Sequence, residues 1–241
     1  MRWCCLAISI VVAAALGAQT PAPMPAPVLV ELFTSEGCSD CPPADRLLAR
    51  LDGHAIVLSE HVDYWNSLGW KDPFSAALFS RRQETYCSEL GAQQGPYTPQ
   101  MVVDGEAQFV GSDAGRAADE IAKAARRPKA DVKLTRTAAG LQVEIASAPA
   151  SGDVWMVLAD NRDESQVAAG ENKGRRLEHI AVVRSLQKIG TVKRGGAFSH
   201  LAELPASAAT QRVVVFVQQP GQGRVTGAAM WRADASPSGS Q

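Results

Sequence analysis

One segment near the start of the chain constrains the fold more than any other: a buried strand that leads into a Cys-x-x-Cys pair. Residues 28–33 form an apolar run that only Glu31 interrupts, which predicts a buried strand of the kind found in parallel sheets. Cys38 and Cys41 follow after a short loop. A Cys-x-x-Cys pair beside a strand–helix pattern is typical of a thiol–disulfide redox site.

A helix should begin at this pair. The apolar residues that follow recur with helical spacing: Ala44, Leu47, Leu48 and Leu51. Pro42 and Pro43 suit the first turn, where a missing N–H costs little. Because a helix N-terminus favours a thiolate, we expect Cys38 to be the more exposed and reactive sulfur. Cys41, within the first turn, would then resolve mixed disulfides.

Other roles for the pair remain open from the residues. A static disulfide would close a loop of four residues, which stabilises a protein by only about 2 kcal/mol in the chain-entropy model. A structural zinc site needs a second ligand pair, and none stands at zinc spacing in this sequence. A binding module with a static disulfide and a copper or zinc chaperone on the same sulfurs are the two alternatives to redox catalysis.

The first part of the chain alternates strands and helices. After the first helix, the expected elements are a strand, a helix, a hairpin of two strands and a third helix, at residues 55–62, 74–90, 100–103, 106–110 and from about 113 onward. Asp104-Gly105 is a favoured two-residue hairpin turn. This order predicts an α/β domain over residues 28–127.

From about residue 130 the hydrophobic period changes from that of a helix to that of a strand. Apolar and polar residues alternate in three stretches: 141–145, 180–182 and 213–217. Several strands with little helix predict an antiparallel β-rich, sandwich-like domain, which we place at residues 128–233. Residues 234–241 read as a flexible tail.

The N-terminal residues are typical of an export signal. Arg2 precedes a short apolar run that ends in small residues, so residues 1–18 predict a signal peptide. The Pro-rich residues 19–27 predict an extended linker. Export implies a periplasmic or secreted protein in which disulfides persist, with no stable membrane insertion after cleavage.

The charge balance bears on which classes of partner to expect. Twenty-four Lys and Arg face 25 Asp and Glu, which gives no electrostatic reason to expect a nucleic-acid partner. We expect a protein or a small thiol or disulfide as the substrate, with no cofactor and no metal.

Thr98-Pro99 lies directly before the hairpin, and together with the elements above it resembles the thioredoxin fold over residues 28–126. The resemblance implies that Pro99 follows a cis bond and packs against the disulfide, and that Thr98 pairs with the substrate backbone. Glu31 then fills the place of the buried acid that accepts a proton from Cys41, with a pKa raised by desolvation. An exposed Glu31 at a sheet edge is the alternative.

A narrower resemblance spans both halves of the chain. Four blocks resemble the secreted bacterial thioredoxin-like family called domain of unknown function 1223: ELFTSEGCSDCPPAD, HVDYWNSLGWKDPF, YTPQMVVDG and GENKGRRLEHIAVVR. The family implies a thioredoxin-like fold and export. It implies no substrate.

Parallel strands at 28–33 and 55–62 would bring several side chains to one sheet edge. These are Cys38, His61, Asp63, Tyr64, Trp65 and Pro99. Tyr64, Trp65 and Trp70 would form an apolar groove beside the disulfide, or would pack inside the core. His61 would assist proton transfer, or would be a buried, hydrogen-bonded histidine.

Two further features concern the rest of the chain. Polar residues gather in one stretch of the second half: Gly174, Arg175, Arg176, Glu178 and His179. They predict either a salt-bridge network or a charged loop laid over the redox edge that restricts the substrate. Cys87 is expected to be a small buried residue of its helix.

Overall fold

The computed structural model describes residues 26–205 and 211–232. The expected signal peptide at 1–18, all but the last two residues of the linker and the tail at 234–241 lie outside the described residues. No helix in the described part of the chain is both long enough and apolar enough to cross a membrane.

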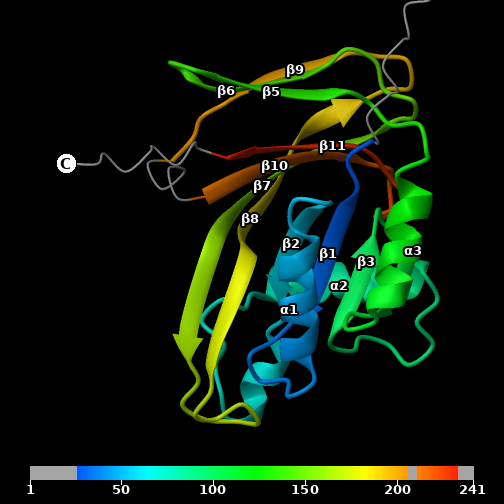
Figure 1. Cartoon of the computed structure of the whole chain (residues 1–241). Coiled ribbons are helices and arrows are strands. Elements are labelled where there is room, and N and C mark those ends of the chain that lie inside the picture. The colour runs from blue at the N-terminus through cyan, green and yellow to red at the C-terminus, as the bar shows by residue number, and fades with distance from the viewer. Residues whose placement is uncertain (1–25, 206–210, 233–241) are drawn as a thin grey trace, which may run out of the picture.

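An eight-stranded sheet organises the structure, in the order β11-β10-β7-β8-β2-β1-β3-β4. In that order the strands are Val225–Arg232, Gln211–Gln218, Gly152–Gln166, Arg176–Val192, Ile56–His61, Leu29–Thr34, Gln100–Val103 and Ala107–Val110. A second sheet holds β5 (Val132–Thr137), β6 (Gly140–Ile145) and β9 (Phe198–Ala202). Figure 1 shows this smaller sheet lying across one end of the large one.

The first part of the chain has the predicted order of elements. β1 pairs with β2 in parallel and with β3 in antiparallel orientation. The helices are α1 (Cys41–Leu51), α2 (Ala77–Glu89) and α3 (Ala114–Ala124), with a short 3₁₀ helix η1 (Tyr64–Leu68) before α2. α1 and α3 cover one face of the sheet and α2 covers the other (Figure 1).

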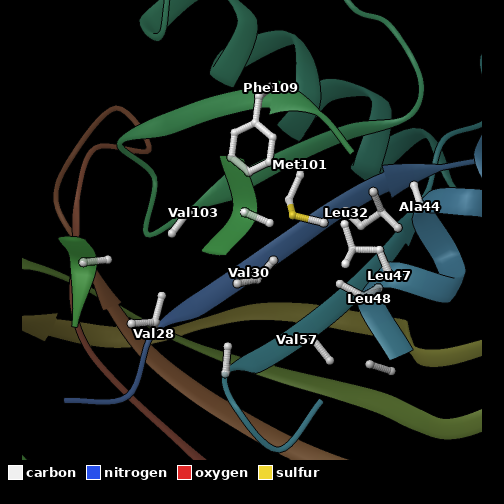
Figure 2. Packing of buried hydrophobic residues seen from close by; sticks show 14 residues of the cluster. Val28, Val30, Leu32, Ala44, Leu47, Leu48, Val57, Met101, Val103 and Phe109 are labelled. Carbon is white, nitrogen blue, oxygen red and sulfur yellow. The ribbon is translucent and has the colours of Figure 1, made fainter. Parts of the chain in front are cut away.

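The alternation of side chains along β1 explains these two layers. Val30 and Leu32 point toward α1, where they pack with Leu47 and Leu48. Figure 2 shows this cluster together with Val57 of β2, Met101 of β3 and Phe109 of β4. The alternate residues of β1, which begin at Leu29, point to the α2 face, where Leu29 packs with Phe79.

The second half of the chain is divided between the two sheets, although the predicted domain boundary suggested a separate unit. Its strands β7, β8, β10 and β11 pair with one another in antiparallel orientation, as expected, but they continue the sheet of the first half. The junction is a parallel pairing of β2 with β8, at Ser59 and Val182. Without β8, β2 would present an unpaired edge of N–H and C=O groups.

The small sheet packs against the outer part of the large one. Leu141 and Val143 of β6 share a buried apolar cluster with Val213 and Val215 of β10. The large sheet therefore packs against α1 and α3 on one face, against α2 on the other face, and against the small sheet in its outer part.

Candidate functional site

The two cysteines lie where β1 turns into α1. Cys38 and Cys41 form a disulfide, with their Cα atoms 5.4 Å apart. The turn is held by backbone bonds, in which Cys38 N donates to Ser35 O and Cys41 N donates to Cys38 O. Cys38 is 1% exposed and Cys41 0%. Both cysteines are thus buried, and the exposed fraction of Cys38 exceeds that of Cys41 by only one percentage point, so the greater reactivity expected of Cys38 stays a prediction.

The hairpin proline lies close to the first turns of α1. The Thr98–Pro99 peptide bond is cis, as the thioredoxin resemblance implies. Gly111 N donates to Pro99 O, and a Cβ atom at Gly111 would lie 3.1 Å from Pro99 Cβ and 3.2 Å from Ala44 Cβ. Pro99 and α1 thus adjoin the same glycine.

The two tryptophans of the aromatic segment reach the site. Trp65 Nε1 donates to Thr98 Oγ1 over 2.8 Å, and Trp65 Cβ lies beside Gly37. Trp70 Nε1 donates to Glu36 Oε2 over 2.8 Å. Both indoles therefore contact the segments that flank the disulfide, one on the Pro99 side and one on the Glu36 side.

Asp63 and Tyr64 point instead toward α2. Asp63 Oδ1 accepts a hydrogen bond from Ser80 Oγ, and Tyr64 OH donates to Gln83 Oε1 over 3.1 Å. Tyr64 has 39% of its surface exposed, and the adjacent Trp65 is less exposed. The structure thus divides the predicted aromatic cluster between the site and α2.

A buried polar cluster lies at the end of β1 and β2, next to the disulfide turn. His61 Nδ1 is 2.7 Å from Asp72 Oδ2, and His179 Nε2 is 3.2 Å from Glu36 Oε1. The two imidazole rings meet edge to face with their centroids 4.7 Å apart. His179 Nδ1 lies 3.9 Å from Asp45 Oδ2. All five side chains are buried.

Mutual contacts set the charge of this cluster. Burial would raise the pKa of Glu36, but hydrogen bonds from His179 and its neighbours outweigh it and lower the pKa. Burial would also raise the pKa of Asp72, but the contacts with His61 and hydrogen bonds from the backbone outweigh it and lower that pKa. Burial would lower the pKa of His179, but Glu36 and Asp45 raise it. Burial prevails at Asp45, whose pKa is raised.

Asp45, rather than Glu31, is the buried acid one helical turn from Cys41. Asp45 lies one helical turn after Cys41, on the same face of α1. Glu31 points to the opposite face, where Oε1 accepts from Arg82 Nε over 2.6 Å and Oε2 accepts from Tyr86 OH over 2.6 Å. Glu31 is buried, so the alternative of an exposed edge position is wrong.

The site also receives a loop from the second half of the chain. Between β7 and β8, residues 167–175 form the tip of a long hairpin, which lies at the same end of the sheet as the start of α1 (Figure 1). Asn172 Nδ2 donates to Glu36 O over 2.8 Å and to Cys38 O over 2.9 Å. Ser39 N donates to Glu171 Oε2 over 3.0 Å. The predicted polar stretch itself forms ion pairs, of Arg176 with Glu164 and of Glu178 with Arg162, as the salt-bridge interpretation expects. The contacts with the disulfide turn come from Glu171 and Asn172, which lie just before that stretch.

Sequence reasoning missed several polar residues of the site: Glu36, Asp45, Asp72 and Asn172. All four lie within the blocks quoted for the family resemblance, but no local spacing marks them as partners. Cys87 is buried, as predicted, and its Sγ lies 3.6 Å from Gln100 Nε2. Among the described residues, no group of three or more His, Cys, Asp or Glu side chains is arranged to hold a metal ion.

These features define a mixed α/β protein whose large sheet carries a Cys-x-x-Cys disulfide at the start of a helix. The chain belongs to the family described as protein of unknown function DUF1223, whose model matches residues 29–218. No curated protein matches the sequence.

Two solved structures share the fold. Protein AGR_C_4864 of Agrobacterium tumefaciens superposes with a TM-score of 0.77 at 26% identity, over 91% of this chain and 100% of that one. HBP35 of Porphyromonas gingivalis superposes with a TM-score of 0.62 at 16% identity, over 91% of this chain and 79% of that one. At that identity the second likeness concerns the fold alone.

Proposed function

We propose that this protein is an exported thiol–disulfide oxidoreductase, with a thioredoxin-like part at residues 28–127 and a β-rich, sandwich-like part at 128–233. One observation carries the proposal: the Cys38–Cys41 disulfide opens α1 directly after the central strand β1, with a cis proline beside the same helix. The predicted signal peptide at 1–18 supports a periplasmic or secreted location, where such chemistry operates.

The reaction exchanges two electrons between the cysteine pair and a protein or small-molecule disulfide. In the reducing direction, the Cys38 thiolate attacks the substrate S–S bond, forms a mixed disulfide and releases one substrate thiolate. The Cys41 thiolate then attacks Cys38 Sγ, forms the Cys38–Cys41 disulfide and releases the second thiolate. The substrate disulfide is reduced and the protein dithiol is oxidised, and the reverse sequence oxidises a substrate dithiol.

Cys41 must lose a proton before it attacks, and Asp45 is the acceptor that the geometry supports best. Its carboxyl is one turn from Cys41 and is held by Thr34 Oγ1 over 3.0 Å. Asp45 also lines a surface pocket together with Pro42 and Arg46, which offers the proton a route to water. Glu31, to which the resemblance assigns this role, stays a candidate that variants must test.

Thr98 and Pro99 would position the substrate chain, and Trp65 would orient Thr98. The hydrogen bond from Trp65 Nε1 to Thr98 Oγ1 supports this arrangement, because it uses the hydroxyl and leaves the Thr98 main chain outside that contact. His61 and Trp70 would act indirectly, through Asp72 and Glu36.

Trapping a reaction intermediate tests the function. Reduced Cys41→Ser is mixed with oxidised glutathione, and peptide mapping by mass spectrometry identifies the modified cysteine. We expect a stable mixed disulfide at Cys38 in Cys41→Ser and none at Cys41 in Cys38→Ser, with catalytic turnover of the disulfide by the unmodified protein. Absence of turnover together with no adduct in Cys41→Ser would contradict the proposal.

A static disulfide in a binding module is the second candidate, and the burial of both sulfurs favours it. The reduction potential separates the two. Structural disulfides have potentials below about −300 mV, whereas redox-active pairs lie above that value. The full chain is equilibrated with thiol buffers of stated potential. Alkylation and mass spectrometry then give the fraction of the Cys38–Cys41 pair that is reduced, and hence its reduction potential.

A further inference from the structure

We propose that the hairpin tip, residues 167–175, is a gate that occupies the place of a polypeptide substrate at Cys38, with Asn172 as its latch. The proposal rests on the proposed function for its substrate class. Its test, however, measures the shielding of the disulfide and does not need catalytic turnover.

The contacts of the tip are those that a peptide would make. The segment 36–39 offers two carbonyl oxygens and one amide, at Glu36 O, Cys38 O and Ser39 N. The Asn172 amide donates to both carbonyls and the Glu171 carboxylate accepts from Ser39 N. A bound extended chain would satisfy the same groups with its own amides and carbonyls. The tip and such a substrate therefore compete for one surface.

Asn172 is held in this position from its other end. Arg175 Nη1 donates to Asn172 Oδ1 over 2.7 Å, which leaves both amide hydrogens for the carbonyls. Asn172 is fully buried although it lies on a hairpin tip. Gly170 approaches Trp70 so closely that a Cβ atom would lie 3.2 Å from Trp70 Cβ, and its φ of 73° forms the turn that presents Asn172.

In this proposal the tip moves as one unit while the rest of the hairpin stays in place. The strand ladder ends at Gln166 and Arg176, and beyond it the tip is closed on itself by backbone hydrogen bonds from Val167 N to Arg175 O and from Gly174 N to Val167 O. Below it, the hairpin is fixed to the buried cluster by Ser165 and His179, both bonded to Glu36. The hydrogen bonds of Glu171 and Asn172, together with the packing of Gly170 against Trp70, must break for the segment 36–39 to become available.

Asn172→Asp turns the latch into a repulsive contact. One carboxylate oxygen keeps Arg175, but the other faces two carbonyl oxygens with no hydrogen to donate. We expect the disulfide of this variant to be reduced by tris(2-carboxyethyl)phosphine about tenfold faster than in the unmodified protein, equivalent to about 1.4 kcal/mol. Because a protonated Asp can donate again, the acceleration should diminish below a pH of about 4.

The substrate class is tested with a second reductant. A peptide thiol of about ten residues needs more room than the phosphine, so the variant should accelerate its reaction by a larger factor. Equal factors for the two reductants would overturn the assignment of a polypeptide substrate.

Two further variants keep the test decisive. Lys173→Ala changes an exposed side chain of the same tip and should leave both rates unchanged. Glu171→Ala removes only the exposed acceptor of Ser39 N and should give a smaller acceleration, about threefold. Glu171→Ala replaces Asn172→Asp in the test if circular dichroism shows that Asn172→Asp does not fold. Rates equal to those of the unmodified protein in every folded latch variant, Asn172→Ala included, would overturn the gate.

Discussion

Thr34 and Asp45 are joined by a hydrogen bond of 3.0 Å, from the hydroxyl at the end of β1 to the carboxyl in α1. The bond fixes the disulfide helix to the central strand on the side of the sheet that carries Cys41. It also turns one Asp45 oxygen away from His179, while the other faces it. Asp45 is therefore a positioned carboxyl, not a surface charge.

We expect Asp45→Asn to slow the resolution of a mixed disulfide at Cys38 by about 100-fold at neutral pH, the typical effect of losing a general base. Asn still accepts from Thr34, so the fold should persist. Release of a chromophoric thiol from the preformed mixed disulfide, followed from pH 6 to 9, measures the effect. The variant should show a rate that rises with pH as Cys41 ionises unaided. An unchanged pH profile would exclude Asp45 as the acceptor.

Glu31→Gln is the matched comparison, because the thioredoxin resemblance assigns the same role to Glu31. Its partners Arg82 and Tyr86 lie on the other face of the sheet, so we expect no change in the pH profile of resolution. We expect lower stability instead, by about 3 kcal/mol, since the variant removes the carboxylate that Arg82 contacts at 2.6 Å and leaves the buried guanidinium with only the longer carboxylate contact, to Glu60. A normal urea midpoint with slow resolution would reverse these assignments.

Local patterns in this chain predict its elements better than they predict its sheet. The apolar run at 28–33 and the spacing from Cys38 to Pro43 identify β1 and the start of α1, because burial and helix geometry act within a few residues. Whether β8 lies beside β2 is different. The alternation around Val182 reports that one face is buried, not which neighbour buries it. The sequence therefore predicts two separate halves.

The same distinction explains the candidate site. Cys38, Cys41 and Pro99 are predictable, because the motif and the hairpin mark them in the sequence. The contacts of Asn172 with Cys38 and Glu36 join residues 134 and 136 positions apart, so no local pattern reveals them. These contacts form because the sheet order brings the β7–β8 hairpin to the end of β1.

Glu60 of β2, a second buried carboxyl on the α2 face beside Glu31, makes the stability of the protein depend on pH. Burial, and then the charge of Glu31, raise the pKa of Glu60 well above its ordinary 4.5. A raised pKa in the folded state contributes stability at low pH that is lost as the pH rises through the folded value. We expect Glu60→Gln to gain stability over the unmodified protein as pH increases, by about 1.4 kcal/mol for each pH unit that separates the folded pKa from the unfolded one.

Urea unfolding of Glu60→Gln and of the unmodified protein between pH 4 and 9 measures the difference. The two curves should nearly coincide at pH 4 and separate above it. Parallel curves would mean that Glu60 titrates alike in the folded and unfolded chain.

Glu36 and His179 should stabilise the protein in a window of mildly acidic pH. The lowered pKa of Glu36 gives stability above its ordinary value of 4.5, lost as the pH falls through the folded value. The raised pKa of His179 gives stability below its ordinary 6.5, lost as the pH rises. Glu36→Gln should therefore cost most between these two values, about 2 kcal/mol. A cost that is constant from pH 3 to 9 would contradict this coupling.

Gly111 should resist any side chain, because α1 and Pro99 converge on it. A Cβ atom there would lie 2.7 Å from Leu32 Cδ1, in addition to its contacts with Pro99 and Ala44. We expect Gly111→Ala to lower the free energy of unfolding by about 2 kcal/mol. Gly115→Ala is the control: its Cβ would meet only Asp113 Oδ1, at 3.6 Å, and alanine should stabilise α3 by up to about 1 kcal/mol. The two variants should thus shift the urea midpoint in opposite directions.

The residues around the disulfide favour a reducing potential. Asp40 places a negative charge between the two cysteines, and Pro42 and Pro43 remove two backbone donors from the first turn of α1. Both disfavour the Cys38 thiolate, although the helix dipole opposes them. A less stable reduced form means a lower potential, so we expect a value nearer to about −270 mV, as in thioredoxin, than to about −120 mV, as in DsbA. Equilibration with glutathione buffers measures it.

Asp40→Asn should raise that potential by a small amount. Asp40 is exposed and makes no side-chain hydrogen bond at the helix start, so its effect on the thiolate is that of a screened surface charge, about 0.5 kcal/mol. Since 1.4 kcal/mol corresponds to about 30 mV for this couple, the expected increase is about 10 mV. Asp119→Asn removes an exposed charge from α3 and should leave the potential unchanged. A potential near that of DsbA in the unmodified protein, or equal shifts in both variants, would show that other groups determine the redox poise.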